Sequence, residues 1–298
     1  FDPSGGVLRC EAGVTLAEIL ALVVPQGWFL ASTPGTQLAT VGGAVANDVH
    51  GKNHHAVGSF GHHVRALQLW RSDGSVIECR PEDDNGWFRA TIGGLGLTGL
   101  VRWVELQLIP IQNAWMWVES QRFANLTEFW TVNRRAETRW PYTVAWIDCL
   151  ARGKAQGRGI LSAGQHAAAQ ATLPTYKAGN KRVPFDPPFS LINSLSLRTF
   201  NNLYYRQPVK PQGQLTHYIP YFYPLDAIRD WNRIYGRQGF YQYQCVIPPD
   251  EAKSATTALL DAIAASNEGS FLAVLKTFGS KPSLGMLSFP RPGTTLAL

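Results

Sequence analysis

The chain has 298 residues, of which 45% are hydrophobic and 16% charged, and its formal net charge is +6. This length suits two hydrophobic cores better than one, and the composition excludes an intrinsically disordered chain. The basic residues are scattered without a Lys/Arg run or a nucleic-acid motif, which argues against nucleic-acid binding. A solvated basic surface explains the charge, and an anionic ligand such as a phosphate-bearing substrate would also suit it.

The first part of the sequence predicts short strands and helices separated by glycines. A strand is expected over residues 7–13, followed by a helix for which Thr15 is the expected N-cap and which ends at Pro25. A short strand over 28–32 leads into a glycine-rich loop, and residues 65–81 are expected to form a hairpin. The segment GGLGLTG then leads into a strand, whereas a Rossmann fingerprint would open a helix, so it is weak evidence for that fold.

The sequence changes character near Gln112, where tryptophans and tyrosines begin to alternate with polar residues. Amphipathic helices are expected over 126–139, 226–236 and 251–267. Residues 151–193, which include VPFDPPF, are expected to form a long surface excursion. Antiparallel strands with segregated helices give an α+β class.

The four cysteines, Cys10, Cys79, Cys149 and Cys245, form no CxxC pair and predict neither a disulfide framework nor a zinc site. We expect most of them to be small buried apolar residues. No apolar run has the length of a membrane span, so a soluble chain is expected, with peripheral contact to a membrane left open. Both ends lie within apolar segments, which suggests a piece of a longer polypeptide.

Residues 33–64 are dense in glycine, a composition that serves backbone approaching a ligand better than a regular helix or strand. Backbone N–H groups in such loops can cradle a pyrophosphate. Two other interpretations remain. His50, His54, His55, His62 and His63 could form a metal cluster, although Gly51 and Gly58 argue against the helix that would align them. Alternatively, the loop is structural and its histidines bond to the backbone.

The stretches TPGT, TVGGAVANDVHGKNHHAVGSFGHHV and ATIGGLGLTGLV resemble the flavin domain of the vanillyl-alcohol-oxidase, or PCMH-type, FAD-linked oxidoreductases. Within that family the chain is similar to the group that oxidises decaprenylphosphoryl-β-D-ribose, since YTVAWIDC, LSLRTFNNLYYR, GFYQYQCVIP and SFLAVLKTFG also fit this group. The resemblance implies an FAD-binding PCMH-type domain, of which residues 1–112 are the C-terminal part. It also implies a substrate-binding domain over 113–270, with an antiparallel sheet flanked by helices, and the start of a return segment to the FAD domain over 271–298.

An Arg-Ser-Tyr-Gly-Asp-like glycine loop that opens the family's flavin domain has no counterpart in this sequence, and neither has its last segment. The resemblance therefore implies that the chain carries one half of the flavin cradle. The FAD is expected to be noncovalent, because no histidine or cysteine matches an attachment site.

The resemblance also implies site residues. The FAD would be lined by Gly35, Thr40, Val41, Gly42, Gly43, Asn47, Asp48, Val49, His50 and Val101. The substrate pocket would contain Lys52, Trp146, Tyr204 or Tyr205, Tyr243, Cys245 and Lys276. Lys276 and His50 are the expected catalytic pair, with Lys276 orienting or deprotonating the substrate hydroxyl while hydride leaves the same carbon for flavin N5.

The activity implied is oxidation of the 2′-hydroxyl of a polyprenyl-phosphoryl-β-D-ribose to a 2′-keto sugar, a precursor of cell-wall arabinan. An NAD-dependent reductase would be the partner that completes an epimerisation, and the enzyme would be soluble or peripheral to the bacterial inner membrane, on its cytoplasmic or periplasmic face. Two alternatives stay open. One is an FAD-linked alditol or aldonolactone oxidase, and the other is a non-catalytic binding or assembly module.

Overall fold

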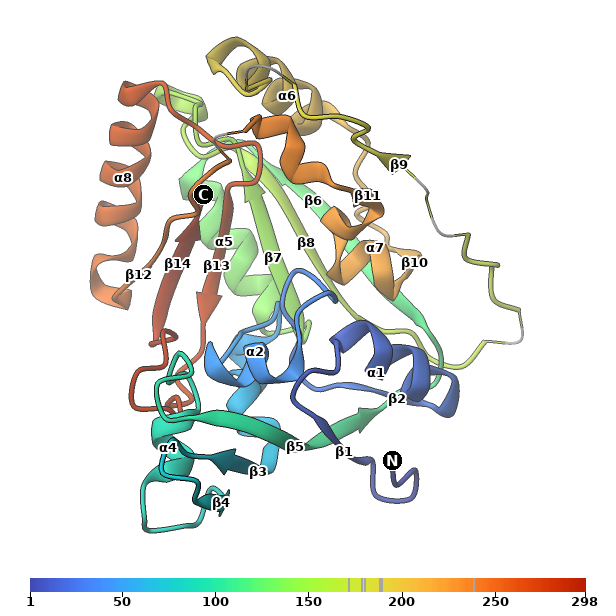
Figure 1. Ribbon diagram of the computed structural model, residues 1–298. Coiled ribbons are helices and arrows are strands. Elements are labelled where there is room, and N and C mark those ends of the chain that lie inside the picture. The colour runs from blue at the N-terminus through green and yellow to red at the C-terminus, as the bar shows by residue number, and fades with distance from the viewer. Residues whose placement is uncertain (171, 178, 180, 188–189, 238) are drawn as a thin grey trace.

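Two mainly antiparallel sheets organise the structure, which confirms the α+β class (Figure 1). The computed structural model describes residues 1–170, 172–177, 179, 181–187, 190–237 and 239–298. Pro188 and Phe189, part of the expected excursion, lie outside the described residues. In Figure 1 the five-stranded sheet lies below, in blue to teal, and the seven-stranded sheet rises above it.

The five-stranded sheet has the order β1-β5-β3-β4, with β2 also paired to β5. Its strands are β1 (Val7–Glu11), β2 (Trp28–Leu30), β3 (Val64–Trp70), β4 (Val76–Cys79) and β5 (Leu100–Pro110). Helix α1 (Leu16–Val23) begins at Thr15, whose side chain forms a capping box with Glu18, and a 3-10 turn (Val24–Gln26) follows it. The predicted cap and the predicted 65–81 hairpin are therefore confirmed.

The glycine-rich segment contains a helix that the sequence analysis did not expect. Helix α2 (Val41–Ala46) is capped by Thr40 and includes Gly42 and Gly43. A Cβ on Gly42 would lie 3.0 Å from the Cβ of Ala12, so glycine lets the helix approach the end of β1 closely. The remaining elements here are α3 (His54–Val57), a 3-10 turn (Phe60–His63) and α4 (Trp87–Thr91).

The seven-stranded sheet has the order β10-β6-β8-β7-β13-β14-β12. Its strands are β6 (Trp115–Phe123), β7 (Tyr142–Ile147), β8 (Gly159–His166), β10 (Gln214–His217), β12 (Gln244–Ile247), β13 (Val274–Phe278) and β14 (Gly293–Ala297). The prediction of a surface excursion over 151–193 was wrong for β8, which pairs along its length with both β6 and β7. Its small residues misled the sequence analysis, since Gly159 and Gly164 leave room for neighbouring strand backbone.

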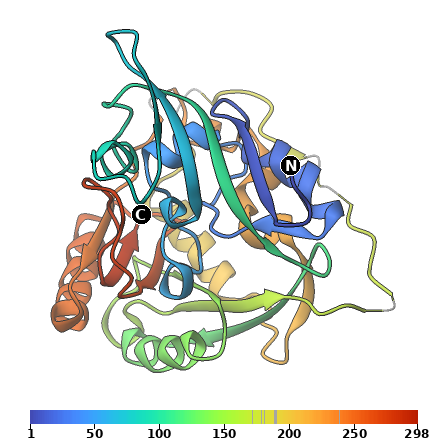
Figure 2. The ribbon, with the colours of Figure 1, turned by 90° about the horizontal axis from the view of Figure 1, so that it is seen from below.

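Helices α5 (Leu126–Glu137) and α8 (Ala252–Ser266) cover one face of this sheet, on the side away from the first sheet (Figure 2). Their buried side chains, such as Phe129 and Leu260, pack with Leu161 and Leu275 in one hydrophobic cluster. Both helices were expected from the sequence. The further short elements are 3-10 turns over Gly153–Ala155, Pro224–Ala227, Trp231–Tyr235 and Pro249–Glu251, and helix α7 (Tyr218–Phe222).

The helix expected over 226–236 does not form. Two 3-10 turns flank strand β11 (Ile228–Arg229), which pairs in parallel with β9 (Lys181–Arg182). Asp230 adopts a left-handed conformation with φ of 55° and interrupts any helix at this point. Its carboxylate pairs with Arg182, so a contact distant in sequence overrides the local helical pattern.

The two sheets share a core. Phe29 of β2 packs against Tyr218 and Phe222 of α7, within the hydrophobic cluster of the first sheet. Segment 271–298 contributes β13 and β14 to the second sheet. The loop between these two strands reaches helix α4, where the N–H group of Met286 donates to the carbonyl oxygen of Arg89. The change of sheet falls between β5 and β6, and the domain limits at 112 and 270 stay predictions.

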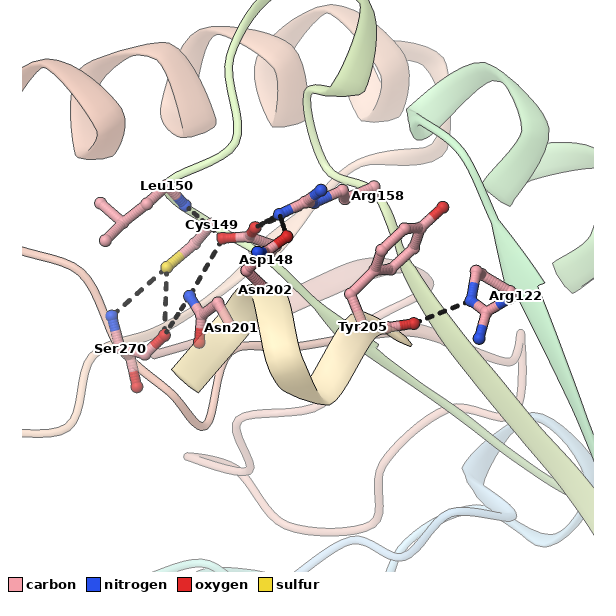
Figure 3. Close-up of polar contacts among 9 residues, drawn as sticks. All are labelled: Arg122, Asp148, Cys149, Leu150, Arg158, Asn201, Asn202, Tyr205 and Ser270. Carbon is pink, nitrogen blue, oxygen red and sulfur yellow. Dashed lines mark hydrogen bonds and ion pairs between the residues drawn. The ribbon is translucent and has the colours of Figure 1, made fainter. Parts of the chain in front are cut away.

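Helix α6 (Ser194–Arg206) is attached through a buried carboxylate (Figure 3). Asp148, at the end of β7, accepts hydrogen bonds from Arg158 Nη2 at 2.8 Å and Nε at 3.0 Å. Its other oxygen accepts from the side-chain amide of Asn201 at 3.0 Å and from Leu150 N–H at 3.2 Å. Because Asn201 is fully buried, this carboxylate fixes α6 against the ends of β7 and β8.

Replacing Asp148 with alanine should lower the free energy of unfolding by about 2–4 kcal/mol, because the partly buried Arg158 and the buried Asn201 lose their acceptor. Urea denaturation measures this change. Glu78→Ala is the matched control, since Glu78 pairs with Arg80 at the surface and should cost less than about 1 kcal/mol. Equal losses in the two variants would contradict an anchoring role.

Candidate functional site

The centre of the site is a contact between the segment that follows α2 and strand β13. The ammonium nitrogen of Lys276 lies 2.8 Å from Nδ1 of His50 and 2.8 Å from the carbonyl oxygen of Gly51. Lys276 is only 8% exposed, and the ring of Phe278 lies 4.7 Å from that of His50. The structure thus brings together the two residues assigned from the sequence as a catalytic pair.

Burial controls the charge of this pair. Burial first, and then the charge of Lys52, lowers the pKa of Lys276 from 10.5 to about 7. Burial and the nearby Lys276 charge hold the pKa of His50 well below its ordinary value. At neutral pH the imidazole is therefore neutral, and Lys276 is divided between ammonium and free amine.

Gln244 completes the pair, and the sequence analysis missed it. Its amide nitrogen lies 3.2 Å from Nε2 of His50 and donates to Oγ1 of Thr295 at 2.8 Å. In the strand ladder Lys276 is opposite Thr295 and Gln244 is opposite Ala297, so these side chains point to one face of the sheet. The alternation in the YQYQC motif was visible, but choosing its site-facing members requires the register.

Cys245 and Tyr243 do not reach this face, contrary to the expectation that they close the pocket. Cys245 is opposite Leu296 and packs against the hydrophobic cluster under α5 and α8. Tyr243 is 56% exposed, and its pKa is raised by the neighbouring Cys245 thiol. Successive residues of a strand point to opposite faces, so placing Gln244 in the site excludes its neighbours.

Trp146 of β7 borders the face of the sheet that carries Lys276. It is opposite Val274, which puts its side chain on the same face as Lys276. The ring of Tyr204 lies 4.6 Å from that of Trp146, whereas Tyr205 lies under the guanidinium of Arg158 at 4.7 Å. Of the two tyrosines left open by the sequence, Tyr204 is therefore the one beside Trp146.

Lys52 adds a second, partly buried positive charge. Its ammonium group donates to the carbonyl oxygen of Phe222 at 3.4 Å, and burial lowers its pKa to about 8. Among the described residues, neither Lys52 nor Lys276 forms an ion pair with a carboxylate. Two unpaired ammonium groups in one interior region favour an anionic ligand.

Asp48 lies inside the protein and organises the cradle. It is fully buried, with φ of 41°, and accepts from Ser59 Oγ at 2.9 Å, Gly61 N at 2.8 Å and Ser288 Oγ at 2.6 Å. The carboxylate therefore connects the end of α2 to the following turn and to the β13–β14 loop. Direct contact of Asp48 with a cofactor is not shown by this geometry.

The other residues expected to line the cofactor surround α2. The N–H groups of Val41, Gly42 and Gly43 bond to Val14 O, Ala12 O and Thr40 Oγ1. These bonds fix the loop, so pyrophosphate contacts over Thr40 to Gly43 stay predictions. Cofactor contacts at three further positions also stay predictions. Asn47 is exposed and its side-chain amide donates to the carbonyl oxygen of Gly43, whereas Val49 and Val101 are partly buried. Gly35 is exposed, with no atom within 4 Å of the place where a Cβ would be.

The other histidines of this segment bond to backbone atoms. Nδ1 of His54 accepts from Gly279 N–H, while ring nitrogens of His55 and His62 bond to the carbonyl oxygens of Trp140 and Pro282. Across the described part of the chain, no group of three or more His, Cys, Asp or Glu side chains is arranged to hold a metal ion.

Comparison with known proteins identifies relatives of this chain. Residues 1–80 match a family model described as an FAD binding domain. Decaprenylphosphoryl-beta-D-ribose oxidase of Mycolicibacterium smegmatis is 33% identical over 98% of this chain and 65% of its own length. An uncharacterized protein of Streptomyces coelicolor is 33% identical over 96% of this chain and 80% of its own. The chain belongs to the PCMH-type FAD oxidoreductases.

This family uses FAD as its cofactor. A more distant similarity, to L-gulonolactone oxidase of Mus musculus, is 31% identity over 34% of this chain and 22% of that protein. The chain spans about 65% of the length of the mycobacterial relative.

The residues present suit FAD. Lys52 and Lys276 supply positive charge for an electron-rich group, and the open face of Gly35 lets a ligand approach the backbone. The ring of Phe289, which is 40% exposed and lies 6.2 Å from that of His50, offers apolar surface to a flat ring system.

The lowered pKa of Lys276 makes stability depend on pH. Between about 7 and 10.5 the unfolded chain binds more protons than the folded protein, so the free energy of unfolding should rise with pH in this window. Lys276→Met should reduce that rise by up to about 1.4 kcal/mol per pH unit. Urea denaturation across the window measures it, with exposed Lys253→Met as the control. Parallel profiles for wild type and Lys276→Met would contradict the burial of a titrating lysine.

Proposed function

We propose that the chain carries the substrate side of an FAD-dependent oxidation of a sugar hydroxyl, the 2′-hydroxyl of a polyprenyl-phosphoryl ribose. One observation carries the proposal: the buried nitrogen of Lys276 lies 2.8 Å from two acceptors, His50 Nδ1 and Gly51 O. A free amine has two N–H bonds and one lone pair. When the proton of neutral His50 is on Nε2, both N–H bonds are used by these acceptors, and the lone pair is left to receive the proton of a substrate hydroxyl.

The neighbouring groups support this role for Lys276. His50 stays neutral, and in the tautomer that carries its proton on Nε2 the Nδ1 atom accepts a hydrogen bond whether Lys276 is amine or ammonium. The Gln244 side-chain amide faces Nε2 of the same ring, and with its oxygen turned toward that nitrogen it accepts the Nε2–H bond and fixes this tautomer. Trp146 and Tyr204 place aromatic surface beside the face that carries Lys276.

FAD, when bound, accepts the two electrons of the carbon–hydrogen bond as hydride. Lys276 takes the hydroxyl proton at Nζ and, as ammonium, donates to His50 Nδ1, Gly51 O and the new carbonyl oxygen. Noncovalent binding of FAD remains our expectation. Gly35 and the residues that follow α2 would hold it through backbone contacts, and the unpaired charge of Lys52 would favour the anionic part of the substrate.

The substrate class rests on the mycobacterial relative, whose name states oxidation of decaprenylphosphoryl-beta-D-ribose and which is similar over 98% of this chain. The similarity to the lactone oxidase covers only 34% of the chain, so it supports a shared substrate less than the match to the mycobacterial relative does. An NAD-dependent reductase that consumes the 2′-keto product is the partner we propose. Among the described residues no helix has the length and apolar character to cross a bilayer, and peripheral membrane contact is part of the proposal.

Lys276→Met in the FAD-loaded protein should slow flavin reduction by a prenyl-phosphoryl ribose about 10²–10⁴-fold, because the proton acceptor is lost. The FAD absorbance should be retained. Anaerobic stopped-flow at the visible flavin band measures the rate. In the wild type the rate should rise with pH through about 7, as Lys276 becomes a free amine. Lys253→Met should behave as wild type, and a Lys276→Met rate within twofold of wild type would rule out this residue as the base.

The substrate class can be tested separately. We expect the flavin to be reduced by a farnesyl-phosphoryl ribose and to remain oxidised with L-gulono-1,4-lactone or a free alditol, since these lack the anionic group that Lys52 favours. The same stopped-flow assay gives both rates. Reduction by the lactone alone would support the alternative, an alditol or lactone oxidase. Failure of the protein to take up FAD would contradict both the ribose oxidase and this alternative.

A further inference from the structure

Helix α6 presents an apolar surface that the protein leaves open. Leu195 and Leu203 are 76% and 65% exposed, and Phe200 is also exposed. The helix is held by Leu197, which is buried in the hydrophobic cluster of the second sheet, and by polar contacts, through Asn201 to Asp148 and through Arg122, which donates to the carbonyl oxygen of Tyr205 at 2.7 Å (Figure 3). The exposed leucines and phenylalanine are therefore not needed to attach the helix, which calls for another explanation of the apolar surface.

A continuous run of aromatic rings connects this surface to the site. The ring of Tyr204 lies 4.6 Å from Trp146, and that of Phe200 lies 5.6 Å from Tyr204. Phe271 lies 5.5 Å from Phe200 and 5.9 Å from Tyr235. The run continues from Tyr235 to Phe240 over 4.4 Å. These six residues are called the aromatic run below.

One end of the aromatic run is fixed at the site. Trp146 points to the sheet face that carries Lys276, and its indole N–H donates to Phe271 O at 2.8 Å. The other end, at Phe240, is 43% exposed and is followed by the fully exposed ring of Tyr241. The aromatic run thus begins on the sheet face that carries Lys276 and ends at exposed rings, where Trp231 also packs against Tyr235 and Phe240.

We propose that the aromatic run binds the first isoprenoid units of the substrate's lipid tail. This inference rests on the proposed function, which places the ribose at Lys276. A prenyl chain is a flexible apolar ribbon, and ring faces bury such a chain without requiring fixed polar contacts. A run that starts at the reacting face extends away from the sugar as the tail of a sugar phosphate must.

The test uses the FAD-loaded protein and ribose phosphate esters that differ only in the tail: methyl, geranyl and farnesyl. In wild type the KM should fall as the tail lengthens. In the Phe200→Ala/Phe240→Ala double variant the KM for the farnesyl ester should rise about tenfold, while kcat and the KM of the methyl ester stay unchanged. Leu22→Ala, which removes a half-exposed apolar side chain from α1, should match wild type.

Direct binding separates this inference from the proposed function. Farnesyl phosphate, titrated calorimetrically into the FAD-loaded protein, should bind wild type about tenfold more tightly than the double variant. That result would support the prenyl site even if no ribose ester reduced the flavin, an outcome that would reject only the proposed function. A KM independent of tail length, together with equal farnesyl phosphate affinities, would overturn the inference. So would a double variant that loses only sedimentation with anionic phospholipid vesicles, since the surface would then bind a bilayer.

Discussion

The site depends on one contact across the two sheets, in which the nitrogen of Lys276 meets His50 Nδ1 and Gly51 O at 2.8 Å each. An ammonium group buried at 8% exposure is costly unless it is hydrogen-bonded, and here its partners are neutral. The protein meets this cost partly by lowering the lysine pKa to about 7. Burial without a carboxylate partner raises the free energy of the ammonium form, and for the same reason it leaves part of Lys276 as a free amine that can accept a proton at neutral pH.

Other parts of the structure hold the two sides of this contact in place. Asp48 gathers three donors from separate segments and so fixes the backbone that presents His50. On the opposite side, Asp148 attaches α6 and thereby sets Tyr204 against Trp146. Both carboxylates act through hydrogen bonds in the interior, where unpaired groups would be costly and geometry is therefore well specified.

Local signals in the sequence predicted much of this structure. The Thr15 cap, the 65–81 hairpin and the helices α5 and α8 follow from capping, turn and periodicity rules that act over a few residues. Residue chemistry alone left three interpretations of residues 33–64 open: a ligand-binding loop, a metal cluster and a structural loop. The resemblance of the HGKNHH motif to the FAD family favoured the first.

The errors came from contacts that are distant in sequence. Choosing Gln244 over Cys245 needs the register of β12, β14 and β13, which no local pattern fixes. Strand β8 was missed because its small residues suggested a loop. In the structure, glycines in this strand make room for the backbone of the neighbouring strands. The helix expected over 226–236 is interrupted at Asp230, which has a left-handed conformation next to the pairing of β11 with β9.

A double-mutant cycle between His50 and Lys276 tests the central contact most directly. The variants His50→Ala, Lys276→Met and their combination would be compared by the free energy of unfolding at pH 8, where much of Lys276 is free amine. If the two side chains stabilise each other across the sheets, the single changes should be non-additive, with a coupling energy of about 0.5–3 kcal/mol. Strictly additive changes would contradict the contact and the site built on it.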